Sequence, residues 1–165
     1  MITVKIAELS IAIDNKFSEI ENMARDYITD EAPLFTVSVA PIEIEEEKKI
    51  SKVSYQDGYY EAVIAYRHIA ERLPEYDAFV FHSAVISVGD KAYSFTARSG
   101  VGKTTHVRLW LSEFSDAEII NGDKPIIRFI DGIPYAFGTP FQGKERYGRN
   151  MKAPLSTVAD RKSVV

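Results

Sequence analysis

The chain has 165 residues, of which 45% are hydrophobic and 27% are charged, and its net charge at pH 7 is −4. This length and composition predict a globular protein with one domain, or one domain and a small N-terminal layer. The acidic balance argues against nucleic acid as a partner. The absence of cysteine excludes disulfides and thiolate metal sites.

The sequence shows neither a stretch as long as a membrane span nor the apolar core of a signal peptide after Met1. We therefore expect a cytoplasmic protein with no membrane partner.

Residues 1–75 predict a small α+β region. Apolar residues alternate with polar ones between positions 4 and 13 and again over residues 35–39, as in strands. Ser18 and Glu21 have the spacing of a capping box, which predicts a helix behind them. The charged run at 43–49 indicates a solvated loop or helix face rather than an acidic binding site.

A second helix is expected after Asp57, which we expect to cap it. Apolar residues then recur at spacings of three and four, which predicts a helix face that packs in the core rather than one that lines a ligand. The residues of this expected stripe are Tyr59, Val63, Tyr66, Ala70 and Leu73.

Residues 76–165 predict a nucleotide-binding region. Residues 79–88 and 91–97 favour strands, and Gly89-Asp90 fits the two-residue loop of a hairpin between them.

Residues 97–105 read Ala-Arg-Ser-Gly-Val-Gly-Lys-Thr-Thr, which matches the phosphate-loop pattern G-x-x-x-x-G-K-[ST] except that Ala97 replaces the first glycine. Glycines let backbone N–H groups turn toward phosphate oxygens, Lys103 supplies positive charge to the β- and γ-phosphates, and the Thr104 hydroxyl is a ligand for Mg²⁺. The expected cofactors are therefore ATP and Mg²⁺. The expected nucleotide-binding residues are Ser99, Gly100, Val101, Gly102, Lys103, Thr104 and Thr105.

An amphipathic helix is expected behind this loop, with Val107, Trp110, Leu111 and Phe114 on one face. Trp110 is then interpreted as a core residue rather than a platform for adenine. The alternative for the whole motif is a glycine-rich turn between strand and helix that binds no ligand.

Asp123 is the second candidate ligand of Mg²⁺. It follows a short apolar stretch at 118–120, which favours a buried strand, and an acid at a strand end near a phosphate loop commonly supports the metal. The alternative is that Asn-Gly-Asp at 121–123 only forms a turn.

Four segments of the chain follow one family pattern over roughly residues 76–154, namely 81–84, 95–106, 122–125 and 135–144. They resemble the HPr serine kinase-like proteins of the phosphoenolpyruvate carboxykinase-type P-loop superfamily. The resemblance implies an α/β fold, with a mixed β-sheet around a P-loop helix. It also implies that the nucleotide-binding region is incomplete relative to the family. Because a shortened sheet leaves an open edge, we expect a homo-oligomer or another partner to cover it.

The resemblance also implies catalytic residues. His82 lies 21 positions before Lys103, as an active-site histidine does in that family. The family carries two aspartates where this chain has Gly122-Asp123, and the first of them is the catalytic base. Either Asp123 serves instead or phosphoryl transfer is impaired. The expected catalytic set is therefore Asp123, His82 and Lys103.

The roles of three further basic residues remain open. His106 and Arg108 begin the expected helix and either reach a phosphate or lie on its surface. Lys144 either meets phosphate or substrate or is a solvated residue of a turn.

Three functions follow from these observations. The first is ATP-dependent phosphoryl transfer to a serine or threonine hydroxyl, or to a small-molecule hydroxyl, with a small protein or a small molecule as phosphoacceptor. The second is a catalytically impaired nucleotide-binding protein with a regulatory or scaffold role. The third, an ATPase or carboxykinase-like reaction, ranks last because the further ligands of a carboxykinase are not evident in the sequence.

Overall fold

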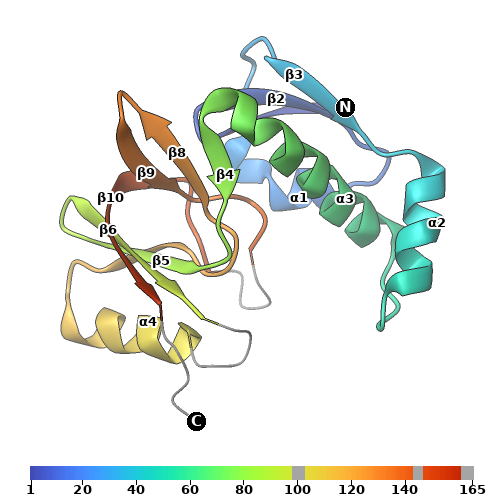
Figure 1. The fold of residues 1–165 in the computed structure, drawn as a ribbon. Helices are drawn as coiled ribbons and strands as arrows, with labels where there is room; N and C mark the ends of the chain where they lie inside the picture. The colour runs from blue at the N-terminus through green and yellow to red at the C-terminus, as the bar shows by residue number, and fades with distance from the viewer. Residues whose placement is uncertain (98–102, 143–146, 161–165) are drawn as a thin grey trace. The chain divides into compact units, whose positions relative to one another are not determined.

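The computed structural model describes residues 1–97, 103–142 and 147–160, without the side chains of Lys103 and Thr104. The chain divides into two compact units, Met1–Pro74 and Glu75–Val165 (Figure 1). No helix in the described parts of either unit is long and apolar enough to cross a membrane.

The first unit contains a three-stranded sheet in the order β1-β2-β3. The antiparallel pair β1 (Ile2–Ile6) and β2 (Leu9–Asp14) is joined by Ala7 and Glu8, whose positive φ angles of 51° and 62° are those of a tight hairpin turn. The strand β3 (Phe35–Ser38) runs parallel to β2. The α-helices of this unit are α1 (Glu19–Met23), α2 (Pro41–Ile50) and α3 (Asp57–Arg72), and short 3-10 turns lie at Arg25–Tyr27 and Leu73–Tyr76.

Two predicted helix caps in this unit are wrong. Ser18 precedes α1 but makes no capping hydrogen bond through its side chain. Asp57 is the first residue of α3 rather than its cap, which is Gln56, and its carboxylate lies 2.7 Å from the ammonium of Lys48 on α2. A capping contact that the sequence analysis missed is made instead by Glu43, whose Oε2 accepts a hydrogen bond from the N–H of Ala40 at the start of α2.

The stripe expected on α3 is only partly right. Tyr66 and Leu73 are buried, but Tyr59 is exposed and its ring lies 4.3 Å from that of Tyr55. The helix instead buries a wider face than expected, because other elements of this unit cover it on more than one side. The buried apolar side chains of α3 are Tyr60, Ala62, Ile64, Ala65, Tyr66 and Ile69.

The second unit contains a seven-stranded mixed sheet in the order β4-β8-β9-β10-β6-β5-β7. All neighbouring strands are antiparallel except β10 and β6, which are parallel. The strands are β4 (Ala78–Val80), β5 (Ala84–Val88), β6 (Lys91–Thr96), β7 (Glu118–Asn121), β8 (Ile126–Ile130), β9 (Ile133–Phe137) and β10 (Lys152–Asp160). The expected mixed α/β architecture is therefore present.

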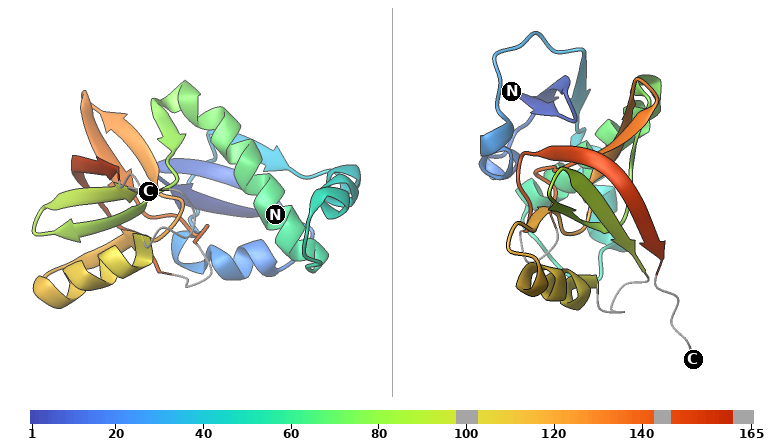
Figure 2. Two further views of the ribbon diagram at one scale, coloured as in Figure 1. Left: turned by 60° about the horizontal axis from the view of Figure 1, so that its bottom comes forward. Right: turned by 90° about the vertical axis from the view of Figure 1, so that its left-hand side faces the viewer.

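The strand β10 joins the two halves of this sheet (Figure 2). Residues 152–154 pair with β9, and residues from Leu155 onward pair with β6, with a register shift between Leu155 and Thr157. Pro154 lies where the strand changes partner, a place where its missing N–H is tolerated. The sheet curls at this strand and encloses a core of Val85, Ala92, Ile120, Ile127, Ala136 and Ala153.

The hairpin predicted at Gly89-Asp90 is confirmed. Val88 pairs with Lys91, and Gly89 has a φ of 60°, which glycine adopts without strain. Behind β6, the helix α4 (Lys103–Glu113) packs on the outer face of the sheet, where Val107 is buried beside Phe95. Trp110 packs against the same cluster, as expected of a core residue.

Candidate functional site

One edge of the large sheet gathers the ends of several strands. Both β6 and β7 run antiparallel to β5, so they run parallel to each other and end at the same edge. Ala84 at the start of β5 pairs with Phe95, and Val85 pairs with Asn121. Residues that follow β6 and β7 therefore emerge beside residues that precede β5.

The expected phosphate loop leaves this edge. β6 ends at Thr96 and α4 begins at Lys103, so the expected strand and helix lie on either side of this segment. Ser99, Gly100, Val101 and Gly102 lie outside the described residues, as do the side chains of Lys103 and Thr104. Thr105 is exposed in the first turn of α4. Phosphate binding by this segment therefore stays a prediction.

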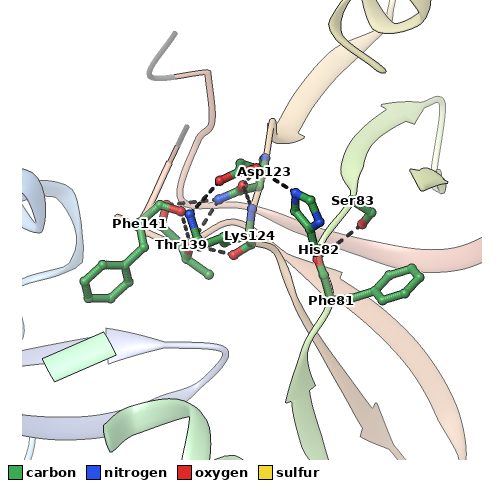
Figure 3. A network of polar contacts seen from close by, with 8 residues as sticks. Phe81, His82, Ser83, Asp123, Lys124, Thr139 and Phe141 are labelled. Carbon is green, nitrogen blue, oxygen red and sulfur yellow. Dashed lines mark hydrogen bonds and ion pairs between the residues drawn. The ribbon is translucent and has the colours of Figure 1, made fainter. Parts of the chain in front are cut away.

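His82 and Asp123 meet at the same edge. The imidazole Nε2 of His82 lies 3.2 Å from Oδ1 of Asp123, and the other carboxylate oxygen, Oδ2, lies 2.6 Å from the ammonium of Lys124 (Figure 3). The side chain of His82 is 57% exposed and that of Asp123 is 24% exposed. A solvated histidine in contact with a half-buried carboxylate is an arrangement that can accept and hold a proton.

Backbone hydrogen bonds join the segment that carries His82 to the segment that carries Asp123. The N–H of Ser83 donates to the carbonyl of Asp123 at 3.2 Å, and the N–H of Phe81 donates to the carbonyl of Pro125 at 3.0 Å. The hydroxyl of Thr96, at the end of β6, donates to the carbonyl of His82 at 3.3 Å. His82 is thus tied to the strand that leads into the expected phosphate loop and to the turn that carries Asp123.

The turn itself is formed by Asn121 rather than by Asp123. Oδ1 of Asn121 accepts hydrogen bonds from the N–H groups of Asp123 and Lys124, at 2.9 and 2.8 Å. This is the Asx chemistry that the sequence analysis raised as the alternative role of Asp123. Because Asn121 performs it, the carboxylate of Asp123 is left to face His82 and Lys124.

A buried threonine completes the turn. The amide nitrogen of Asn121 donates to the hydroxyl of Thr139 at 3.0 Å, and that hydroxyl lies 2.9 Å from the carbonyl of Lys124. Asn121 and Thr139 both have no solvent exposure. Neither residue was predicted to have a role of its own, since Asn121 was expected only in a turn and Thr139 lies in the family-like segment 135–144.

Gly138, the residue after β9, lies where several stretches of backbone approach closely. The N–H of Gly138 donates to the carbonyl of Met151 at 2.9 Å, and a Cβ at Gly138 would lie 1.8 Å from the carbonyl oxygen of Arg149. The N–H of Arg149 in turn donates to the carbonyl of Ile120 at 3.1 Å. Backbone from three segments is therefore packed together here, and only glycine fits.

Of the three remaining basic candidates, two lie on α4 and one is outside the described residues. The ring of His106 packs edge-on against Phe95, with 4.5 Å between ring centroids. Arg108 is exposed on α4. Lys144 lies outside the described residues.

The described residues fit the requirements of Mg²⁺ in part. They include no group of three histidine, cysteine or acidic side chains able to hold a metal on its own. Mg²⁺ bound with a nucleotide needs only one or two protein carboxylates, because phosphates and water supply the other ligands. Asp123 carries one such carboxylate, and its two oxygens contact His82 and Lys124. Thr104, the other expected ligand, cannot be judged because its side chain is not described.

No protein-family model matches the sequence, and no curated protein matches it. One solved structure that resembles the chain is the HPr(Ser) kinase/phosphatase from Coxiella burnetii, with a TM-score of 0.39 and 8% sequence identity. The similarity covers 49% of this chain and 58% of that chain. The chain therefore matches little more than half the length of that protein, and the resemblance is a distant one between folds.

Proposed function

We propose that the chain binds ATP with Mg²⁺ through residues 97–105 and transfers a phosphoryl group to a hydroxyl, either of a serine or threonine or of a small molecule. The observation that carries this proposal is the meeting of His82 and Asp123 at the sheet edge from which the expected phosphate loop departs. A phosphoryl transferase needs positioned charge more than covalent chemistry, so a small set of residues at one edge suffices.

Each residue then has a proposed role. Lys103 would offset negative charge on the γ-phosphoryl group, and Thr104 and Asp123 would hold Mg²⁺, which when bound would neutralise the phosphates. If Asp123 Oδ1 accepts the Nε2–H of His82, the Nδ1 atom of the ring is left to take the proton of the substrate hydroxyl. The alternative route is direct removal of that proton by Asp123, with His82 assisting.

The second candidate function is nucleotide binding without turnover. Two observations favour it. Both carboxylate oxygens of Asp123 already contact nitrogen atoms of other side chains, and glycine occupies position 122, where the resembling family has its base. An ATPase or carboxykinase-like reaction remains the third candidate, and no additional observation favours it.

The binding experiment is calorimetric titration of the full chain with ATP and Mg²⁺, followed by measurement of ADP and phosphate in the same sample. We expect Lys103→Ala to weaken ATP binding at least 100-fold, since it removes the charge that faces the phosphates. Lys91→Ala is the matched control, because Lys91 is exposed at the start of β6 in the hairpin with β5. Equal affinities of wild type and Lys103→Ala would refute nucleotide binding by this loop.

The turnover experiment compares Asp123→Asn with Asp90→Asn. Asp90 is an exposed acid in the loop between β5 and β6, at the end of these strands away from His82, and its replacement should leave turnover unchanged. Asp123→Asn should reduce turnover at least 100-fold if the kinase function is right. Binding without turnover in the wild type would instead favour the regulatory function.

A further inference from the structure

The turn that carries Asp123 is held from inside the protein by two polar side chains. Asn121, on the last position of β7, and Thr139, two residues after β9, are both fully buried. Buried polar side chains are stable only when their hydrogen-bonding atoms find partners, so the geometry of such a pair is strongly specified.

The orientation of the Asn121 amide is fixed by its neighbours. Its oxygen faces two N–H donors, those of Asp123 and Lys124, while its nitrogen faces the hydroxyl of Thr139 at 3.0 Å and the carbonyl of Thr139 at 3.3 Å. A flipped amide would place its N–H groups against those of Asp123 and Lys124 and its oxygen against the carbonyl of Thr139, and so lose these three contacts.

The hydroxyl of Thr139 links two stretches of backbone. It accepts from Asn121, and its single proton is shared between the carbonyl of Lys124 at 2.9 Å and the carbonyl of Phe141 at 3.2 Å. In Figure 3 the rings of Phe81 and Phe141 point away from this cluster. The turn at 121–124 and the segment at 139–141 are thereby joined.

We infer that Asn121 and Thr139 are positioning residues that hold the carboxylate of Asp123 against His82. This inference rests on the proposed function, in which Asp123 and His82 act on the substrate hydroxyl. Neither positioning residue reaches the reacting atoms, since both are buried beneath the turn. A shift of the segment after β9 is passed through Thr139 to the backbone of Lys124 and so to Asp123.

The first test follows the contact itself by NMR of the full chain, with the ring resonances of His82 as the probe. Asp123→Ala provides the reference spectrum of a His82 without its carboxylate partner. Thr139→Val removes the linking hydroxyl and should move the His82 resonances at least halfway toward this reference. Thr139→Ser keeps the hydroxyl and should restore the wild-type positions.

A matched control separates loss of a buried hydroxyl from loss of this link. Ser94 in β6 is fully buried, and within the described parts of the chain its hydroxyl has no hydrogen-bond partner. Ser94→Ala should leave the His82 resonances in place. Wild-type resonances in Thr139→Val would overturn the inference, and so would an equal change in Ser94→Ala.

A second variant keeps the test decisive if Thr139→Val does not fold, as judged by circular dichroism. Asn121→Asp retains the oxygen that accepts from Asp123 and Lys124 but replaces the donor to Thr139 with an acceptor. It should move the His82 resonances in the same direction as Asp123→Ala. Unmoved resonances in a folded Asn121→Asp protein would again overturn the inference.

Kinetics give the second readout where the wild type turns over ATP. Thr139→Val should lower kcat at least 10-fold while changing the KM for ATP less than twofold, because the nucleotide is held elsewhere. A rise in KM with unchanged kcat would contradict a positioning role. If the wild type neither binds nor turns over ATP, the proposed function fails, whereas the His82 resonances still decide whether the pair positions Asp123.

Discussion

Each unit of the chain contains one buried polar side chain that anchors a loop through two consecutive backbone N–H groups. In the first unit, the carboxylate of Glu61 on α3 accepts from Lys16 at 2.7 Å and from Phe17 at 3.1 Å. In the second, the amide oxygen of Asn121 accepts from Asp123 and Lys124. Glu61 is 1% exposed and Asn121 is fully buried.

The two anchors differ in reach and in what they present. Glu61 bonds to residues 44 and 45 positions away, so it joins a helix to the segment between β2 and α1. Asn121 bonds to residues two and three positions ahead, and its turn displays Asp123 beside His82. The same kind of hydrogen bonding therefore joins segments that are distant in the sequence in one unit. In the other unit it places a candidate catalytic group within a local turn.

The largest expected effect concerns the packing that surrounds the Asn121 turn. Gly138→Ala should lower the free energy of unfolding by about 3 kcal/mol or more, because its Cβ would overlap the carbonyl oxygen of Arg149. Gly122→Ala is the control, since its Cβ would lie 3.3 Å from the carbonyl oxygen of Tyr147. Urea denaturation measures the free energy of unfolding of both variants. Equal losses would show that the close approach at Gly138 does not make this position more sensitive than Gly122.

The next effect tests the anchor of the first unit directly. Glu61→Ala removes a buried carboxylate that accepts from two backbone N–H groups and should cost about 3 kcal/mol, because hydrogen bonds to a charged group contribute about 1.5–3 kcal/mol each. Glu71→Ala, in an exposed position of the same helix, should cost less than about 0.5 kcal/mol. If thermal or urea unfolding finds the two variants alike, Glu61 is not an anchor and the comparison with Asn121 fails.

A smaller effect is expected where polar contacts are exposed. Arg67 on α3 contacts Glu47 on α2 through both terminal nitrogens at 3.1 Å, but its side chain is 52% exposed. Arg67→Ala should change the free energy of unfolding by less than about 1 kcal/mol, because solvent and salt screen such a pair. A loss as large as that of Glu61→Ala would mean that burial does not set the strength of these contacts.

The smallest effect is one of pH. A hydrogen bond from Lys5, together with one from Ser10, lowers the pKa of the Glu31 carboxyl from its ordinary value of 4.5. Because the folded pKa is lowered, this contribution is present above pH 4.5 and is lost as the pH falls through the lowered pKa. Glu31→Gln should therefore show a shallower loss of stability on acidification. Parallel acid limbs of the two unfolding curves would exclude the contribution.

Local patterns predicted the elements of the second unit well where each residue's role depends on near neighbours. The Gly89-Asp90 hairpin needs only a turn that glycine accommodates, and the packing of Val107 and Trp110 follows from helix spacing. The failures came in the first unit, where contacts outside the helix pattern decide the outcome. Asp57 is drawn to Lys48 instead of capping its helix, and Tyr59 lies against Tyr55 instead of in the core.

The candidate site shows the same division. The sequence singled out His82 and Asp123, and the structure brings them into contact. No local pattern in the sequence pairs Asn121 with Thr139, because the two residues are 18 positions apart and meet only through the curl of the sheet. Residues 156–160 lie beyond the part of the chain that resembles the family, yet they belong to β10 and its pairing with β6.

The place of β10 has a consequence for how the protein is made. Residues 152–160 are synthesised after every other strand of the second unit, but they lie between β9 and β6 in the finished sheet. Without β10, the hairpin of β5 and β6 and the pair of β8 and β9 would each have an unpaired edge. The site edge at Thr96 therefore gains its parallel neighbour only when β10 has paired with β6.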